Sequence, residues 1–276
     1  MRGAVLEKRD SRDANPVVGA RGVLHPVEQA RHVELTHLPP SPALVPYVEH
    51  YWCVRWRVDG VYETKVLSHP SVHLVMEPDG VFVYGVPRDL FVRRLEGRAH
   101  ALGVKFRPGA FRAFSGGPVA ELADRRLPAA DLFGPEAETL REAVQAAVEP
   151  AEMAALTESF LLPRLPASPD PDALLAAEIV ARFTAEPALF RVGEAAAAVG
   201  LSVRALQRLF AEYVGASPKW VLRRARLHEI ATRADTSAEI DWPGLAAELG
   251  YSDQSHLIRD FTGTIGEPPT RYTSRP

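Results

Sequence analysis

The chain has 276 residues, of which 46% are hydrophobic and 24% are charged, and its formal net charge at pH 7 is −3. The length suits two globular domains. The sequence contains no run of 18 apolar residues, so no membrane-spanning helix is expected. The single cysteine, Cys53, excludes an intrachain disulfide and favours a reducing cytoplasm. The acidic balance excludes a uniformly basic nucleic-acid-binding protein, so such binding requires a local basic patch.

The start of the chain shows no sustained pattern. Residues 1–33 mix charged residues, glycine and proline without a hydrophobic period, which predicts a flexible N-terminal lead. Its apolar patch is too short for a secretion signal. The proline-rich run at 35–47 predicts an extended chain, and we expect a first folded domain from 34 to 165.

Short segments rich in Val, Phe, Tyr and Trp then alternate with turn residues. Closely spaced strands of this kind predict an antiparallel barrel or sandwich. The expected strands are 51–58, 63–67, 71–76, 81–84, 90–95 and 98–106.

Aromatic residues are frequent in these strands. By strand alternation Trp52, Val54 and Trp56 share one face of the sheet. Such side chains are mostly core residues, and the alternative is a ligand cavity lined by Trp52, Trp56 and Tyr84.

Beyond residue 106 the pattern becomes helical, with amphipathic segments at 119–124, 135–148 and 151–162. A break with four prolines at 163–172 marks the domain boundary. The second domain is therefore expected from 166 to 276, beginning with a helix over 172–184.

Residues 194–213 read as two short helices around a tight turn. Gly200 supplies the backbone freedom that the turn needs, and Ser202 is a natural N-cap for the second helix, from about 202 to 213. Leu206 and Phe210 fall on its buried side. This helix-turn-helix pattern places the second helix in a DNA major groove, although any all-α domain can contain two helices around a glycine.

A second copy follows 51 residues later, where Arg208 recurs as Arg259 and Phe210 as Phe261. Chance rarely repeats buried and exposed positions together. A helix from 218 to about 233, ~25 Å long, joins the copies and can set two recognition helices about one DNA turn, ~34 Å, apart. The segment 202–233 contains seven basic residues and only two acidic ones. This excess gives the local positive charge that phosphate binding requires.

Polar side chains on the outer faces of the two recognition helices, 202–213 and 253–262, are candidates for base contacts, because Arg and Gln can read base edges. The alternative is a solvated charged face. The base-contact candidates are Val203, Arg204, Gln207, Arg208, Gln254, Ser255, Ile258 and Arg259. The phosphate-contact candidates are Ser202, Lys219, Arg223 and Arg271.

Two stretches, LSVRALQRLFAEYVGASPKWVLRRARL and GYSDQSHLIRDFTGTIGEPPTRY, resemble the DNA-binding domain of AraC/XylS-type transcription regulators. The stretches PSPALVPYVEHYWCVRW and VLSHPSVHLVMEPDG resemble the cupin-like (DUF6597-like) sensory domain that is often attached to it. The resemblance implies a two-domain α+β protein. A cupin-like antiparallel β-barrel with helices is followed by an all-α domain of two helix-turn-helix units joined by a long helix.

The resemblance also implies a function. The chain is expected to be a cytoplasmic bacterial transcription regulator that binds double-stranded DNA through two successive major grooves and is not an enzyme. An excess of arginine over lysine agrees with a GC-rich bacterial genome. Further expected partners are a small-molecule effector, RNA polymerase if the protein is an activator, and a second copy of the chain, with no membrane and no cofactor.

Two alternatives stay open at this stage. A cupin-type enzyme would need metal ligands in the barrel, for which His69, His73 and His100 are the available residues. They lack the usual His-x-His pair, so no metal and no catalytic residue is expected. The other alternative is a barrel that serves only as a dimerisation or anti-sigma-type interaction module.

Overall fold

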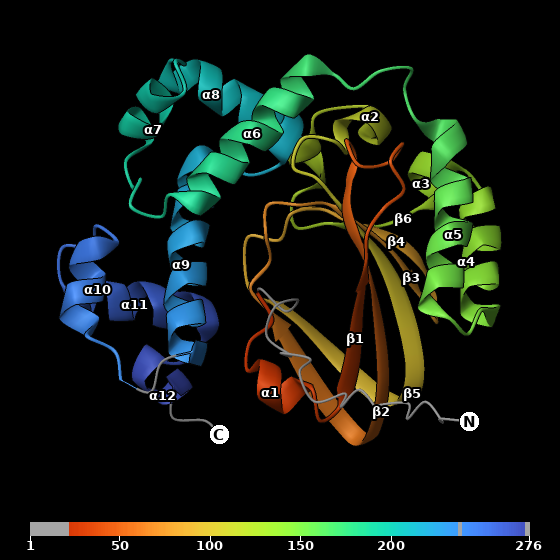
Figure 1. Cartoon of the computed structure of the whole chain (residues 1–276), viewed down its shortest axis with the longest axis horizontal. Helices are drawn as coiled ribbons and strands as arrows, with labels where there is room; N and C mark the ends of the chain where they lie inside the picture. The colour runs from red at the N-terminus through yellow and green to blue at the C-terminus, as the bar shows by residue number, and fades with distance from the viewer. Residues whose placement is uncertain (1–21, 237–238, 274–276) are drawn as a thin grey trace, which may run out of the picture.

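The computed structural model describes residues 22–236 and 239–273 (Figure 1). Its N-terminal half is built on one antiparallel six-stranded sheet with the strand order β1-β2-β5-β3-β4-β6. The strands are β1 (Val33–Leu38), β2 (Val48–Val66), β3 (His73–Glu77), β4 (Gly80–Tyr84), β5 (Phe91–Phe106) and β6 (Arg126–Pro128).

The strands are antiparallel as predicted, but the sheet is open, so the predicted barrel is wrong. Within the described residues β1 and β6 form its two edges and do not pair with each other. The long central strands β2 and β5 each span two predicted strands. The Asp59-Gly60 pair does not close a hairpin, because both residues are inserted opposite β5 as an irregularity between Val58 and Val61. A turn-type dipeptide thus kinks one strand instead of ending it.

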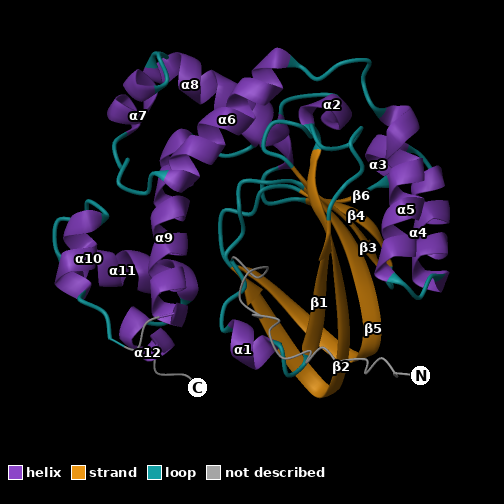
Figure 2. Cartoon of the chain, viewed as in Figure 1, coloured by secondary structure: helices purple, strands orange, loops and turns teal. Residues whose placement is uncertain are grey.

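Helices cover one face of this sheet, as Figure 2 shows for α4 and α5. Inward-facing residues such as Cys53, Leu102 and Val104 pack there against Val144 and Met153 to form the core. The helical segments of this half are α1 (Pro26–Gln29), α2 (Arg112–Ser115), η1 (Val119–Leu122), α3 (Ala130–Phe133), α4 (Glu136–Ala146), α5 (Pro150–Leu161) and η2 (Leu162–Arg164).

The C-terminal half is helical. In Figure 1 the long helix α9 carries α7 and α8 at one end and α10, α11 and α12 at the other. The elements are α6 (Pro171–Ala185), α7 (Val192–Ala198), α8 (Val203–Leu209), the π-helical turn η3 (Phe210–Val214), α9 (Pro218–Thr236), α10 (Trp242–Glu248), α11 (Gln254–Ile265) and α12 (Pro269–Thr273).

Residues 22–33, for which the sequence predicts no regular element, are tied into the fold. Val23 forms a β-bridge with Val66, and Leu24 is buried among residues of α9, α10 and α11. His25 bonds to Glu267 through its Nε2 atom, at 3.1 Å, and its backbone N–H donates to the Tyr272 hydroxyl. This segment therefore links the sheet to the end of the C-terminal half. The rest of the predicted lead lies outside the described residues.

Candidate nucleic-acid interface and ligand cavity

The turn between α7 and α8 is built by backbone and cap hydrogen bonds. Gly200 adopts a left-handed conformation with φ +70°, which glycine reaches without steric cost. Its N–H donates to the Ala197 carbonyl at 3.1 Å, and the Leu201 N–H donates to the Ala196 carbonyl at 3.0 Å. The Ser202 hydroxyl then accepts from the Ala205 N–H at 3.1 Å, as an N-cap does.

The turn between α10 and α11 repeats this geometry. Gly250 has φ +69°, its N–H donates to the Ala247 carbonyl at 3.1 Å, and the Tyr251 N–H donates to the Ala246 carbonyl at 2.9 Å. One extra residue then shifts the cap to Asp253, whose carboxylate accepts from the His256 N–H at 2.7 Å. That hydrogen bond lowers the pKa of Asp253, so the cap is charged at neutral pH.

The two helices after these turns bury one side and expose the other. Leu206 in α8 and Leu257 in α11 are fully buried. Among the described residues nothing forms a hydrogen bond or ion pair with the exposed side chains of Arg204 and Arg208. Two of the remaining candidates, Gln254 and Ile258, are half-buried, and Ile258 packs against the core. The exposed ones are Val203, Gln207, Ser255 and Arg259.

Of the phosphate-contact candidates, Ser202, Lys219 and Arg271 are exposed. Arg223 is engaged within the domain. Its Nε donates to Asp260 at 2.6 Å and its guanidinium also donates to Thr264 at 2.8 Å, so it fastens α9 to α11. It therefore orients the second unit relative to the long helix.

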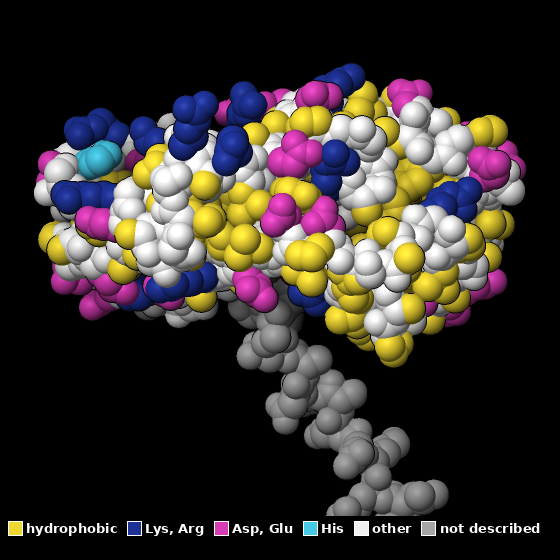
Figure 3. All heavy atoms as spheres, turned by 90° about the horizontal axis from the view of Figure 1, so that it is seen from above, with side chains coloured by type: hydrophobic (Ala, Val, Ile, Leu, Met, Phe, Trp, Pro, Cys, Tyr) yellow, Lys and Arg dark blue, Asp and Glu magenta, His cyan; other side chains and the backbone are white. Residues whose placement is uncertain are grey.

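The basic segment 202–233 is less available than its composition indicates. Arg224 is buried, stacks on the Trp220 ring at 4.4 Å and donates to the Arg88 carbonyl of the N-terminal half. Burial lowers its pKa to about 10. Arg233 is paired with Glu229 and Glu248. The free cations of this segment are thus mostly on and beside α8. Figure 3, seen from above, shows many of the Lys and Arg side chains of this face over the C-terminal half.

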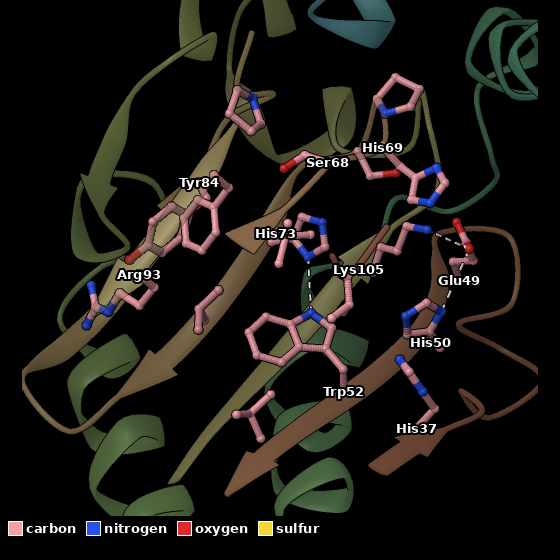
Figure 4. Close-up of a pocket in the computed structure, with 18 of the residues that line it drawn as sticks. His37, Glu49, His50, Trp52, Ser68, His69, His73, Tyr84, Arg93 and Lys105 are labelled. Atoms are coloured by element: carbon pink, nitrogen blue, oxygen red, sulfur yellow. Dashed lines mark hydrogen bonds and ion pairs between the residues drawn. The ribbon is translucent and has the colours of Figure 1, made fainter. Parts of the chain in front are cut away.

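A second candidate site lies on the sheet face that α4 and α5 do not cover. It is a cavity of about 1210 Å³ whose walls include Trp52, Trp56 and Tyr84, the three residues predicted to line a ligand site. Figure 4 shows Trp52 and Tyr84 in this cavity. Trp52 lies over Gly103, its partner in the register of β2 and β5. A Cβ atom at residue 103 would come within 2.0 Å of the indole, so only glycine leaves room for the ring.

A charged cluster occupies one end of this cavity. Glu77 is buried and accepts hydrogen bonds from the Tyr84 hydroxyl at 2.8 Å, from Arg93 at 3.1 Å and from Arg126 at 2.6 Å. Arg126 also lies over the Phe82 ring, 3.3 Å from its centroid. The buried carboxylate of Glu77 is therefore paired with two guanidinium groups.

Histidines and a lysine line the middle and the other end. The Trp52 indole N–H donates to His73 Nδ1 at 3.1 Å, and Lys105 donates to Glu49 at 2.8 Å (Figure 4). Burial, followed by the charge of Lys105, lowers the pKa of His73 to about 3 and that of His50 to about 4. Both rings are consequently neutral at pH 7.

One wall of the cavity comes from α6, the first helix of the C-terminal half. Ala177, Val180, Ala181 and Thr184 face the cavity from this helix. The cavity thus touches both halves of the chain.

The three histidines considered as metal ligands each have another partner. His69 stacks on His228, with ring centroids 4.1 Å apart, His73 bonds to Trp52, and His100 lies near the Val144 carbonyl. Over 22–236 and 239–273 no group of three or more His, Cys, Asp or Glu side chains is arranged to hold a metal ion. In the same residues no helix is long and apolar enough to cross a membrane.

Sequence reasoning missed the polar half of the cavity. His50 could have been found, since it continues the alternation of Trp52, Val54 and Trp56 along β2. Lys105 and Glu77 could not, because their place depends on how β3 pairs with β4 and β5, and register is not readable from one strand.

Two family models match the chain. A domain of unknown function, DUF6597, matches residues 36–128, and a helix-turn-helix domain matches residues 195–275. No curated protein matches.

Three solved structures illustrate the likeness. An AraC-type transcriptional regulator from Chromobacterium violaceum is 21% identical over 36% of this chain and 91% of its own, with a TM-score of 0.32. The DNA-binding domain of AdpA, in complex with a target DNA, is 25% identical over 38% and 92%, with a TM-score of 0.33. ToxT from Vibrio cholerae with a bound unsaturated fatty acid is 9% identical over 87% and 94%, with a TM-score of 0.36. At such TM-scores none of them bears on what this chain binds.

The matched segment 195–275 begins in α7 and includes both glycine turns. The chain thus carries an AraC-type helix-turn-helix domain at its carboxyl end, behind a DUF6597 domain.

Proposed function

We propose that the protein is a transcription regulator that reads DNA with two recognition helices, α8 and α11, placed in successive major grooves. A small molecule held in the cavity modulates this binding. The observation that carries the proposal is the repeated turn, in which Gly200 and Gly250 have the same backbone geometry and each precedes a helix with one buried and one exposed face.

The spacing of the two helices supports this arrangement. Helix α9 has 19 residues and is therefore ~28 Å long at 1.5 Å per residue. One turn of DNA is ~34 Å, so a rod of this length suits two contacts on one face of the duplex.

The two recognition helices differ in what they offer. On α8, Arg204 and Arg208 are free to donate two hydrogen bonds each to a guanine edge. On α11, the half-buried Ile258 offers only methyl groups, so we assign the stricter sequence reading to α8. Lys219, exposed at the start of α9, supplies a phosphate contact that fixes position without reading sequence.

The proposal is tested by selecting bound fragments from genomic DNA with the purified protein and sequencing them. A shared site with two half-elements about one helical turn apart is expected. Gel shifts on this site and on random DNA then compare two variants. Arg208→Ala should cost ~1–3 kcal/mol on the selected site and relax one base preference.

Lys219→Ala is the matched control. It should weaken binding to selected and to random DNA alike, and it should reduce the salt dependence of the affinity by about one phosphate contact. Equal losses on selected and random DNA for Arg208→Ala would show that α8 does not read bases. Fragments without a common site would remove the claim of sequence-specific regulation.

A further inference from the structure

The cavity has unused hydrogen-bonding capacity in its walls. Glu77 already accepts from Tyr84, Arg93 and Arg126. Lys105 carries three donor hydrogens, and among the described residues it donates to Glu49 alone. Its side chain is only 10% exposed and lines the cavity, so a further acceptor would approach the other two hydrogens from the cavity.

His73 adds a second free donor beside Lys105. The two residues are paired across β3 and β5. Because Nδ1 of His73 accepts from Trp52, the neutral ring carries its proton on Nε2, for which no described residue is an acceptor. Figure 4 shows Lys105, His73 and Trp52 pointing into the same space.

The electrostatics around Lys105 favour negative charge. Its charge lowers the pKa of His37, His50 and His73, in each case after the effect of burial, whereas Glu49 offsets it only partly at His37 and His50. The ammonium group therefore places a positive charge in this part of the cavity, beside neutral imidazoles that can donate hydrogen bonds.

Much of the remaining wall is apolar. Trp52, Val54 and Trp56 from β2 and Val180 and Ala181 from α6 enclose a space that exceeds the ~300–1,000 Å³ of common small-molecule pockets. Such a cavity accommodates a ligand with two or more rings or a long hydrocarbon chain.

We infer that the cavity binds an amphipathic organic acid, whose anionic group accepts hydrogen bonds from Lys105 and His73 and whose apolar body packs between the indole rings and α6. Binding itself does not depend on the proposed function; only its effect on DNA does.

Helix α6 gives the ligand a direct route to the first recognition helix. Val180 and Thr184 face the cavity, while Phe183 on the same helix is fully buried and packs on Phe210, with ring centroids 5.8 Å apart. Phe210 directly follows α8. A ligand pressing on α6 therefore acts on the element that supports α8, without a relay through a second subunit.

Ligand class is tested with a pair of fluorescent probes that share the same rings, the anion 8-anilinonaphthalene-1-sulfonate and the uncharged N-phenyl-1-naphthylamine. The native protein should bind the anion at least ~10-fold more tightly, as expected for hydrogen bonds to a charged group. Lys105→Met should remove this preference and leave the affinity for the neutral probe unchanged. Lys65→Met, the same change on the same sheet outside the cavity wall, should leave both affinities unchanged.

Equal affinity of the native protein for the two probes overturns the inference, as does an anion preference that survives in Lys105→Met. Gel shifts in the absence of probe distinguish a failure of this inference from a failure of the proposed function. Lys105→Met should bind the selected DNA like the native protein, so loss of anion preference and loss of DNA binding are independent outcomes.

Contact with α6 is tested by filling the cavity from that side. Ala181→Trp should weaken binding of the anionic probe at least ~10-fold, and it should change the affinity for DNA even when no ligand is present. Glu178→Trp, on the same helix but outside the cavity wall, should do neither. Unchanged probe binding in Ala181→Trp would show that the ligand does not reach α6.

Discussion

At the scale of single residues, the histidine beside Trp52 shows how burial sets a protonation state and a hydrogen bond selects a tautomer. His73 Nδ1 accepts the hydrogen bond from the Trp52 indole N–H. Protonation of Nδ1 would turn this nitrogen into a second donor and break the bond. Burial is the largest cause that lowers the pKa of His73, followed by the charge of Lys105, and the pKa falls to about 3. In the unfolded chain an ordinary histidine titrates near 6.5.

This difference predicts acid sensitivity. Between pH 6.5 and 3 the unfolded chain binds a proton at His73 that the folded chain does not, so stability is retained above pH 6.5 and lost as the pH falls. His73→Gln should flatten the pH dependence of the unfolding free energy between pH 6.5 and 5 by about 1 kcal/mol per pH unit. Urea unfolding at several pH values measures it, and an unaltered slope would contradict the assignment.

The candidate DNA-contact residues could be placed in sequence because the caps and turns around them are local. Ser202 caps its helix as predicted, and the structure shows Asp253 as the cap of the second helix. What the sequence could not show is which cations are already occupied. Arg223, Arg224 and Arg233 count equally in composition, but tertiary partners engage all three.

At the scale of elements, the helices were predictable and the sheet only in part. The hydrophobic period of helices such as α4 and α6 lies within one continuous segment. The sequence therefore predicted the ends of both helices to within two residues. The sheet depends on pairing between distant strands. Nothing within 48–66 indicates that Gly60 bends one continuous strand, or that β1 and β6 stay apart.

The two turns also differ in a way that predicts unequal responses to the same substitution. A Cβ atom at Gly200 would meet nothing within 4 Å, whereas at Gly250 it would lie 2.2 Å from Cδ1 of Phe190. Gly200→Ala should therefore cost about 1 kcal/mol from the left-handed backbone alone. Gly250→Ala should cost clearly more.

Thermal and urea unfolding measure both costs. In the background Phe190→Ala, the additional cost of Gly250→Ala should fall to that of Gly200→Ala, because the clashing ring is gone. Equal costs in the native background would show that Phe190 moves aside freely.

At the scale of the whole molecule, a short segment near the start holds the two halves together. Leu24 is only 3% exposed and packs with Leu67 of the sheet half and with Leu227 and Ile230 of α9. Leu24→Ala should lower the unfolding free energy by about 2–4 kcal/mol, as cavity formation does elsewhere.

The matched control lies three residues further on. Val27 is 60% exposed, so Val27→Ala should change stability by less than about 0.5 kcal/mol. Urea denaturation provides the comparison, with small-angle X-ray scattering to detect separation of the halves. If Leu24→Ala and Val27→Ala behaved alike, the segment would not stabilise the arrangement.

The position of α6 matters for any fusion of the cavity-bearing half to another domain. The proline-rich break at 163–172 is the natural joint by composition, but a chimera fused there would acquire a foreign helix in place of Ala177, Val180, Ala181 and Thr184. A fusion point after Ala185 would carry the complete pocket along. The unit that contains the whole cavity is therefore longer than the domain that the proline-rich break outlines.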